Sequence, residues 1–265
     1  METAIQDRRR DELKVLVRSM ADHIVTTGKE TPQAAEYLIQ NAIEPLCPFN
    51  ETDLLQNPPT EQQLRGQWDV VSFRRAPEQQ GGDQQGPRKT DLEKLTYGAI
   101  RFPQQQQRTP VSVLRTYNEV EPSAKNYHTV HLISSNNTTD TTTHAYCIIY
   151  GTYEVTASSH KRPKSNTLVV TYTHASLAPA ANASDDAQFR SAFGVPPQNV
   201  PLSPTHQCTI CVVYVDHDMR IEFTGENNQQ GFILRLVRRQ GQGISTRFAV
   251  TSVPMEDDAF VLAVG

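Results

Sequence analysis

The start of the chain carries apolar residues at helical spacing. Between Asp11 and Ile24 they recur every three or four residues, which is the apolar stripe of an amphipathic helix. A second stripe runs from Ala35 to Leu46 and follows Thr31-Pro32, a pair typical of a helix start because threonine caps the first turn and proline tolerates its first position. The pattern predicts two antiparallel helices in a segment spanning residues 1–60.

The pattern changes at the stretch Leu64–Phe73, which contains the only tryptophan. A single helical turn is expected just before it, and from Gly66 onward polar and apolar residues alternate as in a β-strand, with Trp68 and Val70 on one face. We expect Gly66 to permit close approach of the backbone and Trp68 to form the floor of a barrel.

Further along, β-branched and aromatic residues gather in short runs between polar loops, as in antiparallel sheets. Because no helices alternate with these runs, the sequence favours an antiparallel barrel or sandwich over a parallel sheet. The expected strands are Tyr97–Phe102, Val111–Val120, Asn126–Ile133, His144–Val155, Thr167–His174, Thr209–Val215, Met219–Phe223, Phe232–Arg238, Arg247–Val253 and Ala259–Val264.

Residues 175–206 interrupt this series. The segment is rich in proline and has one helical possibility at Ser184–Phe193. We therefore expect an insertion that crosses one end of the barrel as a lid.

Composition narrows the function classes. A net charge of −4 with 20% charged residues gives no nucleic-acid footprint, and we predict no nucleic-acid partner. No apolar run is long enough to span a bilayer, so no transmembrane segment is expected. Four scattered cysteines do not form a disulfide framework, which favours a reducing compartment.

Three stretches in order resemble the plastid lipid-associated protein, or fibrillin, family. They are Leu64-Arg65-Gly66-Gln67-Trp68, Tyr214-Val215-Asp216-His217-Asp218-Met219-Arg220-Ile221 and Gly231-Phe232-Ile233-Leu234. The family pattern has an arginine after its Arg-Ile pair that this chain lacks, since Glu222-Phe223-Thr224-Gly225-Glu226 follows instead.

This resemblance implies a mainly β fold. The expected fold is an antiparallel lipocalin-like β-barrel at residues 61–265, preceded by the N-terminal helix pair, which makes the chain α+β overall. The resemblance also implies a plastid location, at thylakoids or plastoglobules. Residues 1–10 do not show a transit peptide, so a cytoplasmic location stays the alternative.

The expected function is non-enzymatic binding of a hydrophobic small molecule, or association with a lipid surface. An apolar wall with a few phenol hydroxyls suits a lipid, quinone, carotenoid or other isoprenoid, although the same rings could simply fill the barrel or stack outside it. Arg220 is expected to reach across the barrel and stack on Trp68. The predicted ligand-binding residues are Trp68, Val70, Tyr117, Tyr127, Tyr150, Tyr172, Arg220 and Phe232.

No catalytic or metal-binding residue is predicted, and no cofactor beyond a bound lipid or pigment. Cys208 and Cys211, three apart in a strand, should face opposite sides, and Asp216 and Asp218 are expected to cap a turn. Two alternatives stay open. One is a scaffold whose filled barrel binds protein partners through its helices and residues 175–206, and the other is an isomerase or cyclase at the barrel mouth.

Overall fold

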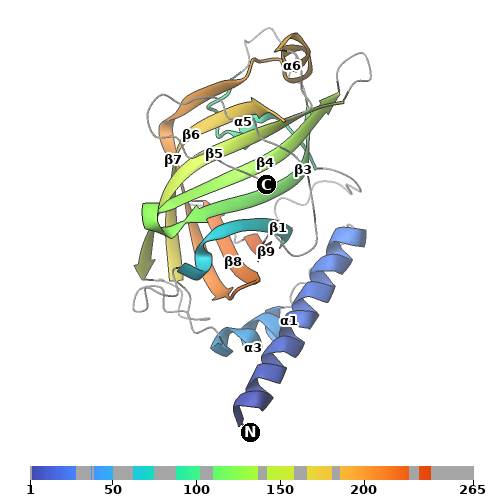
Figure 1. Cartoon of the computed structure of the whole chain (residues 1–265), viewed down its shortest axis with the longest axis vertical. Helices are drawn as coiled ribbons and strands as arrows, with labels where there is room; N and C mark the ends of the chain where they lie inside the picture. The colour runs from blue at the N-terminus through green and yellow to red at the C-terminus, as the bar shows by residue number, and fades with distance from the viewer. Residues whose placement is uncertain are drawn as a thin grey trace.

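The chain folds into a closed antiparallel barrel with a helical extension at one end (Figure 1). The computed structural model describes residues 2–27, 37, 39–49, 62–74, 88–101, 110–136, 142–157, 166–180, 186–226 and 233–239. Nine strands follow the order β1-β9-β8-β7-β6-β5-β4-β3-β2, and β1 also pairs with β3. All strands except the short β2 therefore form a closed ring, which confirms the expected mainly β barrel.

The strands are β1 (Gly66–Arg74), β2 (Arg88–Thr90), β3 (Val111–Glu121), β4 (Asn126–Asn136), β5 (Thr142–Ala157), β6 (Asn166–Pro179), β7 (Gln198–Val215), β8 (Met219–Glu226) and β9 (Ile233–Arg239). The helical elements are α1 (Glu2–Thr27), η1 (Ile39–Ile43), α3 (Glu44–Leu46), η2 (Cys47–Phe49), η3 (Gln62–Leu64), α5 (Leu92–Leu95), η5 (Pro122–Ala124) and α6 (Asp186–Phe193).

The N-terminal helices pack on the outer face of β7 and β8. Val17 of α1 and Ile43 and Leu46 of the following turns join Val213 and Ile221 in one buried apolar cluster. The second helix is irregular, passing from π to α to 3₁₀ geometry, because Pro45 and Pro48 each remove a backbone donor. Within the described residues, no helix combines the length and apolarity needed to cross a membrane.

On one side of the ring the strands are paired over only part of their length. Among the described residues, β8 pairs with β7 only from Cys208 to Val215, and β1 pairs with β3 only from Tyr117 to Val120. The segment that begins with β2 and continues through α5 borders this stretch, since β2 pairs with the start of β3 and Leu92 and Ile100 are buried in the inner core.

The expected strand Tyr97–Phe102 is wrong over its described part. Asp91 caps α5 by accepting a hydrogen bond from the Lys94 amide (2.8 Å), and a turn follows the helix. The short apolar run that suggested a strand instead places Leu92 and Ile100 in the core.

The expected interruption at residues 175–206 is shorter than predicted, because β6 continues to Pro179 and β7 begins at Gln198. Pro201 and Pro204 fit in β7 because they lie where no second strand pairs with it among the described residues. Between these strands, α6 closes the end of the barrel opposite α1 and buries Phe189 and Phe193 in the inner core (Figure 1).

Gly66 is needed for its backbone conformation and not for close approach. Its φ is +116°, which side-chain-bearing residues rarely adopt, and a Cβ there would meet nothing within 4 Å. The expected strands Arg247–Val253 and Ala259–Val264 lie outside the described residues.

Candidate functional site

A charged pair lies inside the barrel near the end that carries α1. Arg220 and Glu222 are two residues apart on β8, so their side chains share the inner face, and both are fully buried. Arg220 Nε lies 2.9 Å from Glu222 Oε2, and Arg220 Nη2 donates to Asn118 Oδ1 (3.0 Å) and to the Tyr127 hydroxyl (3.3 Å). The guanidinium is therefore held in one orientation by groups from three strands.

Two aromatic rings hold the same guanidinium. Arg220 Cζ lies 5.2 Å from the centre of the Trp68 ring and 5.7 Å from that of Tyr127. Trp68 is fully buried and donates from Nε1 to the Leu64 carbonyl (2.8 Å), which fixes the plane of the indole. The expected contact between Arg220 and Trp68 is confirmed.

From Arg220 a row of hydrogen-bonded side chains crosses the barrel. Asn118 Nδ2 donates to Thr129 Oγ1 (3.1 Å), and that oxygen lies 2.8 Å from the Tyr172 hydroxyl. We name Glu222, Arg220, Asn118, Thr129 and Tyr172 the polar row. Its members come from β8, β3, β4 and β6, and none is more than 9% exposed. Burial raises the pKa of Tyr172 well above its ordinary value, so its phenol stays neutral.

The polar row ends at Tyr172, which belongs to a group of three aromatic rings. His206 stands opposite Tyr172 in the β6–β7 register. The ring of Tyr97, from the turn after α5, stacks on His206 with 3.8 Å between centroids and lies 5.6 Å from Tyr172. Tyr97 is 41% exposed. The aromatic group therefore connects the buried end of the polar row with the protein surface.

The predicted ligand-binding residues fall into two groups. Trp68, Tyr127, Tyr172 and Arg220 meet inside the barrel, and Val70 packs against the inner core. Tyr117 and Tyr150 belong instead to an apolar cluster on the outer face of β3, β4 and β5. Phe232 lies outside the described residues.

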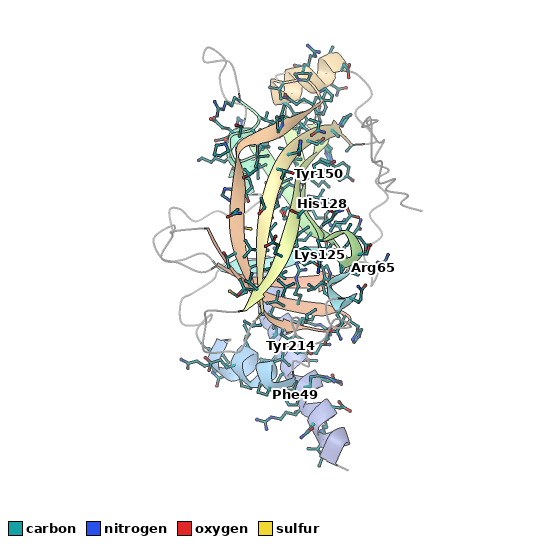
Figure 2. All side chains as sticks on the ribbon, turned by 90° about the vertical axis from the view of Figure 1, so that its left-hand side faces the viewer. Phe49, Arg65, Lys125, His128, Tyr150 and Tyr214 are labelled. Atoms are coloured by element: carbon teal, nitrogen blue, oxygen red, sulfur yellow. The ribbon has the colours of Figure 1, made fainter. Side chains whose placement is uncertain are left out.

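The outer face carries its own polar contacts. Arg115 makes an ion pair with Asp69 through two hydrogen bonds (2.7 and 3.0 Å). The rings of His128 and Tyr150 lie side by side (Figure 2), with 5.0 Å between their centroids. Burial lowers the pKa of His128 to about 4, so the imidazole is neutral at physiological pH. These residues stabilise the wall and are separate from the interior row.

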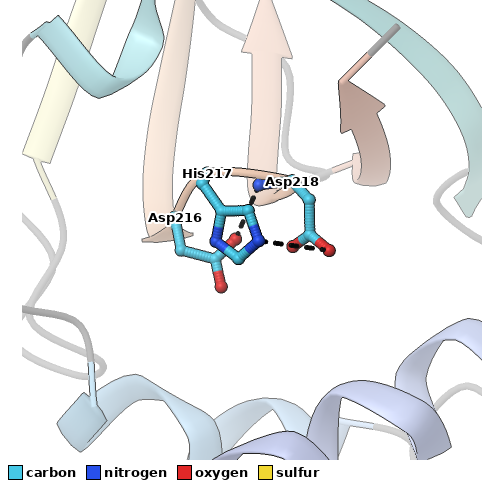
Figure 3. Close-up of side chains that lie close together, drawn as sticks. All are labelled: Asp216, His217 and Asp218. Atoms are coloured by element: carbon cyan, nitrogen blue, oxygen red, sulfur yellow. Dashed lines mark hydrogen bonds and ion pairs between the residues drawn. The ribbon is translucent and has the colours of Figure 1, made fainter. Parts of the chain in front are cut away.

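The turn Asp216-His217-Asp218 superficially resembles a metal site, because one ligand atom from each residue lies within 4.8 Å of the others (Figure 3). Lys14 Nζ, however, lies 2.5 Å from Asp216 and 2.7 Å from Asp218, and Arg18 also binds Asp218. Cations of the protein already occupy both carboxylates. The cluster therefore anchors α1 to the barrel.

Asp216 also caps its turn, as expected from the sequence. Its Oδ1 accepts hydrogen bonds from the backbone amides of Asp218 (3.0 Å) and Met219 (2.9 Å). Burial alone would raise the pKa of Asp216, but hydrogen bonds from Lys14 and the Tyr214 hydroxyl outweigh burial and hold the pKa well below its ordinary value.

Sequence reasoning missed Asn118, Thr129, Glu222, Tyr97 and His206. The spacing Arg220-x-Glu222 in a strand was a usable signal, since residues two apart share a face. Asn118 and Thr129 had no such signal, because only the β3–β4 register places them opposite each other.

The fold and site together define an antiparallel barrel whose largely apolar interior holds the polar row. No protein-family description, curated protein or solved structure matched this chain.

Proposed function

We propose that this protein is a non-enzymatic barrel that binds a hydrophobic small molecule carrying one polar group, and that it is a relative of the plastid lipid-associated protein or fibrillin family. The observation that carries the proposal is the polar row, a line of polar groups set among the apolar side chains of the inner core. Sites for small apolar ligands combine an apolar wall with a few placed polar groups in this way.

The inner wall differs along the barrel axis. Near α1 the inward side chains are large and include Trp68 and Tyr127, whereas the inward positions of β5 and β6 nearer α6 include Ala145, Cys147 and Ala175. Phe189 and Phe193 of α6 belong to the same inner core as these small wall residues. A ligand would place its apolar part here, gaining about 25 cal/mol per Å² of buried apolar area, and its polar group toward Tyr172.

The test is a titration of the full chain. A fatty acid, a quinone and a carotenoid are added separately while Trp68 emission is followed, and solvent extracts of the purified protein are analysed for bound lipids by mass spectrometry. A change with at least one class, or a co-purifying lipid, is expected. An unchanged signal with all three on folded protein, together with empty extracts, would refute the proposal.

A scaffold role is the second candidate, because the interior near α1 is filled by the protein's own side chains. Trp68, Arg220, Tyr127 and Tyr153 are all buried to within 2% exposure. A protein complex that survives purification, with no lipid in the extract, would favour this role. The plastid location that the resemblance implies is tested by imaging a fluorescent fusion of the complete protein.

A further inference from the structure

Tyr97 has a backbone conformation that a tyrosine rarely adopts. The Gly98 amide donates to the Glu93 carbonyl (2.7 Å) and the Tyr97 amide faces the Lys94 carbonyl (3.4 Å), which is the Schellman arrangement at the end of α5. Tyr97 occupies its left-handed position with φ +50°. Glycine normally stands there, because a Cβ is disfavoured in this conformation.

Stacking on His206 and on Tyr172 offsets this cost. The rings of Tyr97 and His206 are 3.8 Å apart with a 13° interplanar angle, and Tyr97 still exposes 41% of its surface. Tyr97 therefore stacks on rings of the barrel wall while a large part of its own surface is exposed to solvent. A partly exposed ring on a disfavoured backbone conformation is a side chain that a competing ring can displace.

The surroundings suit a flat ligand. His206 offers one ring face, the Tyr172 ring lies nearly parallel to it with 6.4 Å between centroids, and the Tyr172 hydroxyl belongs to the polar row. We propose that the Tyr97 ring occupies a binding site for a flat, uncharged ring bearing an oxygen at its edge, and that such a ligand displaces Tyr97 and stacks on His206. This inference rests on the proposed function and narrows its ligand class.

The experiment compares two ligands by isothermal titration calorimetry on the full chain. Menadione is a flat ring with carbonyl oxygens, and dodecanol is a flexible apolar chain with one hydroxyl. Tyr97→Gly removes the competing ring at a position that favours glycine, and His206→Leu removes the stacking face at similar volume. Tyr37→Ala, which truncates another exposed tyrosine, is the matched control.

We expect Tyr97→Gly to bind menadione about three- to tenfold more tightly than the natural protein, the range that one aromatic stack supplies. His206→Leu should weaken menadione binding by a similar factor, and Tyr37→Ala should change nothing. Dodecanol affinity should stay within about twofold in all variants. In the natural protein, menadione should shift the His206 imidazole proton resonances.

If dodecanol binds but neither Tyr97→Gly nor His206→Leu changes the affinity for menadione, the ring site is overturned. The proposed function would not be affected by that result. Failure of both ligands to bind any variant, with Trp68 emission showing folded protein, would overturn the ring site, and the three-ligand titration and lipid extraction described above would then decide the proposed function. Equal gains for menadione and dodecanol in Tyr97→Gly would also overturn the ring site, since they would indicate a general opening of the barrel side.

Discussion

Replacing Arg220 by leucine tests how the barrel interior is held together. The side chain is fully buried, pairs with Glu222 at 2.9 Å, donates to Asn118 and Tyr127, and lies over Trp68. Removing one partner of a buried ion pair costs about 3–5 kcal/mol. The hydrogen bonds and the ring contact share the same guanidinium, so their separate values are not added. We expect a loss of about 3–5 kcal/mol in the free energy of unfolding.

Urea unfolding followed by Trp68 emission measures this loss directly, because the chain has one tryptophan. Arg115→Leu is the matched control, since it breaks an ion pair with Asp69 on the outer face, where the two side chains are 23% and 16% exposed. That change should cost about 1 kcal/mol, near the upper end for exposed pairs.

A cost for Arg220→Leu no larger than for Arg115→Leu would refute the reasoning. Replacing Arg220 and Glu222 together by leucine gives a second check. Removing both charges avoids leaving one of them buried without this partner, so the double variant should be more stable than Arg220→Leu.

Three further perturbations follow from the structure. The pKa of Asp216 is lower in the folded than in the unfolded chain, so its contribution to the free energy of unfolding is present above about pH 4 and is lost as pH falls. The urea midpoints of the natural protein and of Asp216→Asn should therefore converge in acid. A constant difference between the two midpoints down to the acid limit would contradict this. Gly151→Ala places a Cβ 2.8 Å from Tyr172 Cδ1 and should cost about 1–3 kcal/mol in the same urea assay, with a changed Tyr172 ring signal in NMR spectra; unchanged stability would show that the ring moves freely. Phe193→Ala removes a fully buried ring of α6 and should cost about 3–5 kcal/mol, whereas a loss below about 1 kcal/mol would mean that the ring does not contribute to the inner core.

The alternating pattern was enough to predict most of the barrel. The runs beginning at Val111, Asn126 and His144 lie within β3, β4 and β5, because a wall with an apolar inner face alternates at a period of two. The same rule wrongly predicted a strand at Tyr97–Phe102. The apolar spacing in this region also fits one helical turn, and Asp91 stabilises that turn as its N-cap.

The site was predictable in part. Trp68 and Arg220 were expected to meet because an arginine on a late strand could reach across a barrel to the indole at its floor, and they do. The polar row was not expected, since a buried asparagine or threonine looks like any loop residue in sequence and gains its role from cross-strand register. The stack of Tyr97 on His206 was not expected either, because it joins two segments more than 100 residues apart.

The pairing of β1 with both β3 and β9 has a consequence for biosynthesis. β1 (Gly66–Arg74) leaves the ribosome long before β9 (Ile233–Arg239), so the ring cannot close until nearly the whole described chain has been made. Until then β8 and β1 each present an open edge that can pair with another chain. Long-range strand pairing is also slow to form. Synthesis of this protein should therefore pass through an aggregation-prone open sheet, and its yield should depend more on chaperone supply and translation speed than on the stability of the closed barrel.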